Sequence, residues 1–95
     1  MITLADSIWA NISSATRSMI GAHDLTKATN GIAFTVGNDA ANLQRVVVKQ
    51  AAHDVYEVKK IKLDRVTLDQ DISEIITANR QDLEDTVIRV ASQPL

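Results

Sequence analysis

The stretch Asn30-Gly31-Ile32-Ala33-Phe34-Thr35-Val36-Gly37 marks the point at which the chain changes its hydrophobic period. Asn-Gly is a strong turn signal, because both residue types tolerate a positive φ. After this turn, large apolar side chains occupy every second position, which is typical of a β-strand with one buried face. A second turn signal, Gly37-Asn38-Asp39, ends the segment. The sequence therefore predicts a strand between two turns.

Two further strands are predicted after this one. Val46-Val47-Val48 is a β-branched run between polar flanks, and around Tyr56 apolar and charged residues alternate. The alternation slips before Ile61, which predicts a bulge near Lys59-Lys60. Short connections between the three strands favour an antiparallel meander. We expect its inner face to hold Ile32, Phe34, Val36, Val46, Val48, Tyr56 and Val58, and its outer face to carry Thr35, Arg45, Glu57 and Lys59.

A helical period precedes these strands. Apolar residues in 3–20 recur every three or four positions, and Thr3 with Asp6 predicts a capping box at the start. The polar residues in the middle favour either a kink or a restart capped by Ser13. Residues 22–31 are predicted to be a connection.

The helical period returns over residues 70–92, with acidic side chains opposite the apolar stripe. The polar stretch 78–80 leaves two alternatives, because the helix either spans the whole segment or begins at Asn79. Residues 70–78 are then helix, strand or loop.

These elements predict a single α+β domain over residues 1–95. The expected fold has two layers, with a three-stranded antiparallel meander packed against an N-terminal and a C-terminal helix (αβββα). The hydrophobic fraction is 45%, with one Trp, one Tyr and one Phe. The core is therefore expected to be mostly aliphatic.

The composition also narrows the classes of function. The absence of Cys excludes disulfides and thiolate metal sites and favours a reducing compartment. Residues 1–10 show no secretory leader, and the chain has no apolar run long enough to span a membrane. We therefore expect a cytoplasmic protein that does not bind membranes.

Two adjacent His-Asp pairs, His23-Asp24 and His53-Asp54, are the candidate metal ligands. Both pairs fall in predicted connections, and the chain has no third His, so a shared site would require the two segments to meet. There is no glycine-rich phosphate loop and no Ser beside a base. We predict no enzyme activity, no cofactor, no metal site and no small-molecule substrate.

Charge is unevenly distributed along the chain, although the net charge is only −2. Residues 42–66 hold six basic residues against three acidic ones, and residues 67–95 hold six acidic residues against two basic ones. The basic segment would suit a nucleic-acid backbone. Aromatic stacking residues are missing beside it, however, which disfavours nucleic-acid binding.

Several segments, in order, carry a resemblance to a known group of proteins. They are Ile8-Trp9-Ala10-Asn11-Ile12, Ile20-Gly21-Ala22-His23-Asp24, residues 30–37, Arg45-Val46-Val47-Val48-Lys49 and Asp54-Val55-Tyr56-Glu57-Val58. The chain resembles a family of small proteins, roughly a hundred residues long, from tailed bacteriophages, prophages and integrative elements. The match covers most of residues 4–63 and continues weakly to Leu83, with a poor fit over residues 76–81.

The resemblance implies an origin and a fold rather than a chemistry, and places the protein in the cytoplasm of a bacterial host. By analogy, it implies an accessory protein that binds a host factor or defence complex. Our leading hypothesis is a non-enzymatic interaction protein that uses a sheet edge or the acidic face of the last helix, to bind itself or another protein. The alternative is a nucleic-acid-binding protein that uses residues 42–66. The partner-binding candidates are Asp82, Glu84 and Asp85 on the last helix, and Lys59, Lys60 and Lys62 on the third strand, which we expect to be a protected edge.

Overall fold

The computed structural model describes residues 3–37 and 41–93 and has an α+β fold. The elements are α1 (Leu4–Ala10), α2 (Ser14–Met19), β1 (Ala22–Ala28), β2 (Gly31–Val36), β3 (Asn42–Ala52), β4 (Val55–Asp64), β5 (Gln70–Ile72), β6 (Ile76–Asn79) and α3 (Leu83–Ala91). The predicted α+β class with an antiparallel sheet is confirmed. The predicted number of strands is wrong, because the described residues form six strands and three helices.

The sheet has the order β1-β2-β3-β4, and β4 pairs on its far side with both β5 and β6. β5 lies along the C-terminal half of β4, and β6 along its N-terminal half. Ile61 opposes Ile72 and Val58 opposes Ile76, so three residues of one chain segment face two of β4. This one-residue bulge separates β5 from β6.

The bulge is held by two hydrogen bonds between Ser73 and the backbone of Lys60. The Ser73 N–H donates to the Lys60 carbonyl at 2.8 Å, and the Lys60 N–H donates to Ser73 Oγ at 2.8 Å. The serine hydroxyl therefore replaces the carbonyl that a regular strand would offer.

Residues 22–28, predicted to be a connection, form the edge strand β1. The segment shows no apolar alternation because all but its first residue are exposed. Asn30, with φ of 59°, makes the turn into β2, as the Asn-Gly signal predicts.

Residues 70–79, read mainly as helix from their period, form β5 and β6 instead. The last helix begins at Leu83, after the N-cap residue Asp82. Asn79 is not the cap, but its side-chain oxygen accepts a hydrogen bond from the Asp82 N–H at 3.0 Å. Asn79 therefore shapes the turn that leads from β6 into α3.

The N-terminal helical segment restarts at Ser13. Thr3 and Asp6 form the predicted capping box of α1, and the Ser13 hydroxyl accepts a hydrogen bond from the Thr16 N–H at 3.2 Å. The restart is confirmed in preference to a kink. Gly21, with φ of +66°, ends the segment.

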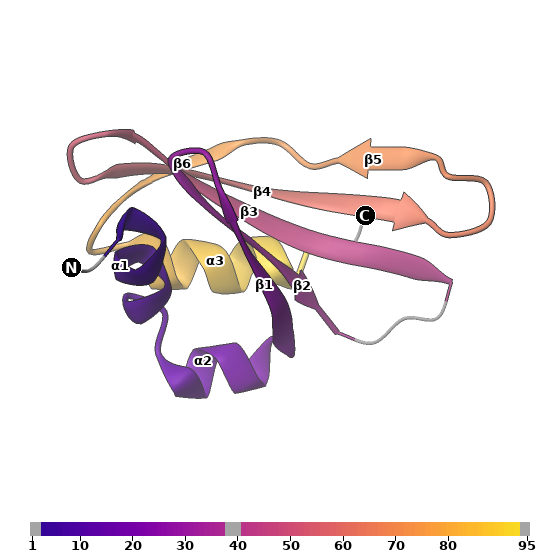
Figure 1. The fold of residues 1–95 in the computed structure, drawn as a ribbon, viewed down its shortest axis with the longest axis horizontal. Coiled ribbons are helices and arrows are strands. Elements are labelled where there is room, and N and C mark those ends of the chain that lie inside the picture. The colour runs from indigo at the N-terminus through magenta and orange to yellow at the C-terminus, as the bar shows by residue number, and fades with distance from the viewer. Residues whose placement is uncertain (1–2, 38–40, 94–95) are drawn as a thin grey trace.

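One face of the sheet carries the core, and α1 and α3 lie on that face (Figure 1). All seven side chains predicted for the inner face are buried. The Trp9 ring lies 5.3 Å from that of Phe34, and the Arg17 guanidinium lies over Trp9 at 4.7 Å from its centroid. The other face has no helix against it among the described residues.

The prediction of a bulge within β4 near Lys59-Lys60 is wrong, because the extra residue lies in the facing segment, residues 73–75. The register between β3 and β4 runs without a break from Asn42 opposite Asp64 to Gln50 opposite Tyr56. Lys60 instead takes an inward position, so Ile61 faces the side of the sheet that the helices leave open. β4 is also an interior strand, and the prediction that it is a lysine-protected edge is wrong.

Candidate functional site

The six residues predicted to bind a partner lie on different parts of the molecule. Asp82 and Asp85 are exposed at the start of α3, whereas Glu84 between them turns toward α2. Lys59 and Lys60 lie on opposite faces of β4, because they are neighbours in a strand. A single surface can therefore include the two aspartates but not the whole predicted set.

The exposed edge of β6 lies beside these aspartates. β6 pairs with β4 on one side. The Arg80 N–H donates to the Asp54 carbonyl at 3.0 Å, so by alternation Ala78 directs its backbone groups toward β4. Thr77 and Asn79 then direct theirs away from β4, toward the free edge.

One of these outward groups is already used. The Asn79 carbonyl accepts a hydrogen bond from the Asp82 N–H at 3.1 Å, within the turn that starts α3. The N–H and C=O of Thr77 and the N–H of Asn79 remain on the edge. They are a short row of backbone donors and acceptors of the kind that another strand can pair with.

α3 forms the second wall beside this edge, because the turn at residues 80–82 folds the chain back at once. Between β6 and α3 lies an open groove of about 510 Å³. Its lining comprises Thr77, Ala78, Asn79, Asp82, Asp85, Thr86 and Arg89. We call this the β6–α3 groove. The two aspartates could be predicted from the sequence, but Thr77 and Arg89 could not, because the sequence leaves residues 70–78 open between helix, strand and loop and so does not indicate a sheet edge there.

The charged side chains of the β6–α3 groove are not paired with one another. Asp82 occupies the N-cap position of α3, yet its side chain makes no capping hydrogen bond. No ion pair within 4.0 Å joins Asp82, Asp85 or Arg89 to another described residue. The groove thus offers two uncompensated carboxylates near one guanidinium.

Glu84 has a structural role. The Ser13 N–H donates to Glu84 Oε2 at 2.6 Å, and this hydrogen bond is the main reason that the pKa of Glu84 is lowered. The carboxylate thereby ties the start of α2 to α3. Glu84 does not line the β6–α3 groove.

Lys60 also has an internal partner. The residue is 3% exposed, and its ammonium group donates to the carbonyls of Ala91 at 3.0 Å and Gln93 at 2.7 Å. Burial, with a smaller effect from the charge of Lys62, lowers the pKa of Lys60. The side chain is not available at the surface.

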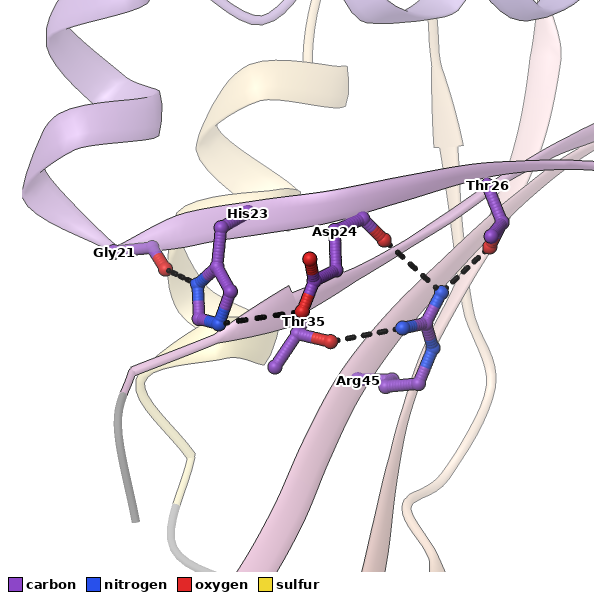
Figure 2. Close-up of polar contacts among 6 residues, drawn as sticks. All are labelled: Gly21, His23, Asp24, Thr26, Thr35 and Arg45. Carbon is purple, nitrogen blue, oxygen red and sulfur yellow. Dashed lines mark hydrogen bonds and ion pairs between the residues drawn. The ribbon is translucent and has the colours of Figure 1, made fainter.

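A second polar cluster surrounds the irregular start of β1 (Figure 2). His23 Nδ1 lies 2.8 Å from the Gly21 carbonyl, which can only accept, so Nδ1 carries the proton. Arg45 of β3 donates to the hydroxyls of Thr35 at 2.8 Å and Thr26 at 2.6 Å. These bonds tie three strands together where the pairing of β1 shifts between His23 and Thr26. Their evident role is to hold that irregularity.

The two His-Asp pairs do not converge. Within each pair, the imidazole Nε2 and the carboxylate are 3.8 Å apart for His23-Asp24 and 3.4 Å apart for His53-Asp54. His23 lies level with Arg45 in the sheet, and His53 lies in the turn at the far end of β3, about 26 Å along the strand. Within residues 3–37 and 41–93, no three His, Cys, Asp or Glu residues group in a way that could hold a metal ion.

The basic residues of segment 42–66 are divided between the faces of the sheet. Arg45, Lys49 and Lys59 share the uncovered face by alternation, and Lys60 points toward α3. Phe34 and Tyr56 are buried on the helix-covered face. The uncovered face therefore gains no stacking platform from them.

Comparison with protein-family models, with curated proteins and with solved structures found no match. Among the described residues, no helix has the length and apolar character needed to cross a membrane.

Proposed function

We propose that this chain is a non-enzymatic interaction protein that binds another protein in the β6–α3 groove. One observation carries the proposal: a free sheet edge and the acidic face of the last helix form the two walls of one groove. Either feature alone is common on protein surfaces. Together they offer a partner hydrogen bonds to the backbone and charge recognition at the same place.

The other free edge supports this choice. β1 carries a shift in its pairing between His23 and Thr26, and Asp24 there has φ of 52°. Irregularities of this kind blunt an edge against pairing with another chain. β6, in contrast, pairs regularly with β4 from Ile76 to Asn79. The regular edge is the one that lies beside the groove.

The charge of the groove favours a different protein over a second copy. A symmetric dimer through β6 would bring together two grooves that each carry two carboxylates and one guanidinium, and therefore a net negative charge on both sides. Like charges brought together across an interface oppose association. The partner is therefore another protein, and the proposed setting is the bacterial cytoplasm, with a host factor or defence complex as the target of a phage or mobile-element protein.

Site-directed photocrosslinking in bacteria tests the proposal. A benzophenone amino acid at position 89 lies in the groove, and the same residue at position 65 serves as the control outside it. We expect an adduct from position 89 that is lost in the double variant Asp82→Lys/Asp85→Lys. It should persist in Asp69→Lys/Asp71→Lys, which changes the charge equally outside the groove.

An adduct that survives the groove variant, or that forms equally from position 65, would contradict the proposal. Because acids stabilise the first turn of a helix, the reversal also weakens α3 somewhat. The variant Asp82→Asn/Asp85→Asn, which retains good N-capping residues, separates that effect from binding. It should lower the yield of the adduct without changing the circular dichroism spectrum.

The nucleic-acid alternative rests on Arg45, Lys49 and Lys59, which share the uncovered face. It predicts binding to DNA or RNA that weakens steeply with added salt. Replacing Lys49 and Lys59 with Glu would abolish such binding and would leave the groove adduct intact.

A further inference from the structure

We propose that the ligand of the β6–α3 groove is an extended segment bearing Lys or Arg side chains, which adds as a strand to β6. This inference rests on the proposed function and specifies the chemistry of the partner. It follows from the backbone groups on one wall and the carboxylates on the other.

The β6 wall of the groove favours a ligand in an extended conformation. Thr77 presents both an outward N–H and an outward C=O, and Asn79 presents an outward N–H. An extended chain alongside β6 satisfies all three groups, whereas a helix has no free backbone groups to offer in its middle. β6 has four residues, so the paired part of the ligand is short. Its backbone pairing alone is weak, and side chains must contribute.

The α3 wall of the groove determines which side chains the ligand should carry. Successive residues of a strand point to opposite faces, so every second side chain of the added segment faces α3. There it meets the carboxylates of Asp82 and Asp85, which have no cation within 4.0 Å among the described residues. Lys or Arg at alternate positions fits this arrangement. Arg89, two turns after Asp82, repels a cation at the other end of the groove and so favours a register that places the cations beside Asp82 and Asp85.

Titration of the full chain with short synthetic peptides tests the inference. The probe is acetyl-Thr-Lys-Val-Lys-Val-Lys-Thr-amide, and its partner replaces each Lys with Glu. Amide chemical shifts report the contact site. We expect the Lys peptide to shift the Thr77 and Asn79 amides, and the Glu peptide to leave them unchanged. Asp82→Asn/Asp85→Asn should weaken binding of the Lys peptide by about tenfold or more.

Substitution at Thr77 tests the strand geometry. Because its N–H points away from β4, proline can replace Thr77 without breaking the ladder, as at other edge positions. Thr77→Pro removes the outward donor, whereas Thr77→Val keeps it. We expect the Lys peptide to bind the valine variant as it binds the wild type, and to bind the proline variant at least about tenfold more weakly.

The outcomes separate this inference from the proposed function. Equal binding of the Lys and Glu peptides at Thr77 overturns the charge preference and leaves the groove as the binding site. Equal binding to the proline and valine variants overturns strand addition. Shifts on the uncovered face around Lys59, or none for either peptide, overturn the inference as a whole, while the crosslink from position 89 still decides whether a folded partner uses the groove. A dimer seen in light scattering that Thr77→Pro converts to a monomer would also overturn it, in favour of a second copy paired at β6.

Discussion

The ammonium group of Lys60, in the middle of β4, donates a hydrogen bond to the carbonyl oxygen of Ala91, the last residue of α3. A second bond reaches Gln93 just beyond. The last carbonyls of a helix lack partners within the helix, and a cation there also suits the negative end of the helix dipole. Lys60 therefore caps α3 from within the sheet, and this contact fixes the helix across the core.

Replacing Lys60 with Met should loosen the end of α3. The variant keeps the apolar stem but removes the two hydrogen bonds to the carbonyls. We expect the amides of Ser92 and Gln93 to exchange with solvent about tenfold faster, corresponding to about 1.4 kcal/mol. Hydrogen exchange measured by NMR checks this. Unchanged exchange would show that solvent replaces the ammonium group without cost.

Lys60 also makes the free energy of unfolding change with pH in the alkaline range. Burial lowers the pKa of Lys60 in the folded chain below its ordinary value of 10.5, so the unfolded chain holds the proton more tightly. The free energy of unfolding should therefore rise as pH increases from the folded pKa toward 10.5. Urea unfolding of the wild type and of Lys60→Met across this range isolates the effect, because the variant lacks it. If the free energies of unfolding of the two proteins changed with pH in the same way, the prediction would be contradicted.

Ser73→Ala should destabilise the protein by about 1–3 kcal/mol. Ser73 is 8% exposed, and without its hydroxyl the Lys60 N–H has no acceptor at the bulge. Ser73→Thr, which keeps the hydroxyl, is the matched control. Chemical denaturation of both variants measures the difference, and equal midpoints would mean that the bulge rearranges to satisfy the Lys60 N–H.

Gly31→Ala should destabilise the sheet by about 3 kcal/mol or more. A Cβ at Gly31 would lie 1.9 Å from the Val48 carbonyl oxygen and 2.8 Å from the Lys49 Cα, so β2 and β3 would have to separate. The positive φ that the Asn-Gly signal predicts belongs to Asn30, and Gly31 is required for close approach instead. Gly37→Ala, where the Cβ would meet nothing within 4 Å, is the control for backbone strain alone. Thermal unfolding compares the two variants. A larger loss of melting temperature in Gly37→Ala would contradict the interpretation that close approach of the strands requires Gly31.

Glu84→Gln should lower stability at neutral pH but not in acid. The hydrogen bond from Ser13 lowers the pKa of Glu84 below its ordinary value of 4.5, so the carboxylate stabilises the fold above that pH. This contribution is lost as pH falls through the lowered pKa. The melting temperatures of wild type and variant should therefore differ at neutral pH and converge in acid. A difference that persists in acid would place the effect elsewhere.

The strands around Phe34, Val46 and Val58 could be predicted from the sequence because one face of each is covered and the other is not. β1 could not, because an exposed edge strand has no apolar alternation. β5 and β6 escaped prediction for a different reason. Ile72 and Ile76 are four residues apart, as on a helix, but the bulge between them turns them to opposite faces of a sheet.

The candidate site was predictable only in part. Asp82 and Asp85 stand out in the sequence as acids near the start of a helix. Their position beside the β6 edge at Thr77 depends on the turn at residues 80–82 and on the bulge at Ser73, which are tertiary features. Lys60 looked like one of three surface lysines, since a buried lysine is rare unless it has partners, and its partners lie 31 and 33 positions away.

The extra residue between β5 and β6 also limits how far a neighbouring chain could run along this side of the molecule. Deleting Glu74 would bring residues 70–79 into one uninterrupted register with β4. The resulting long, flat rim could template the stacking of further copies into fibres. A single inserted residue thus keeps the free edge of β6 long enough to pair with a short segment and too short to support a fibre.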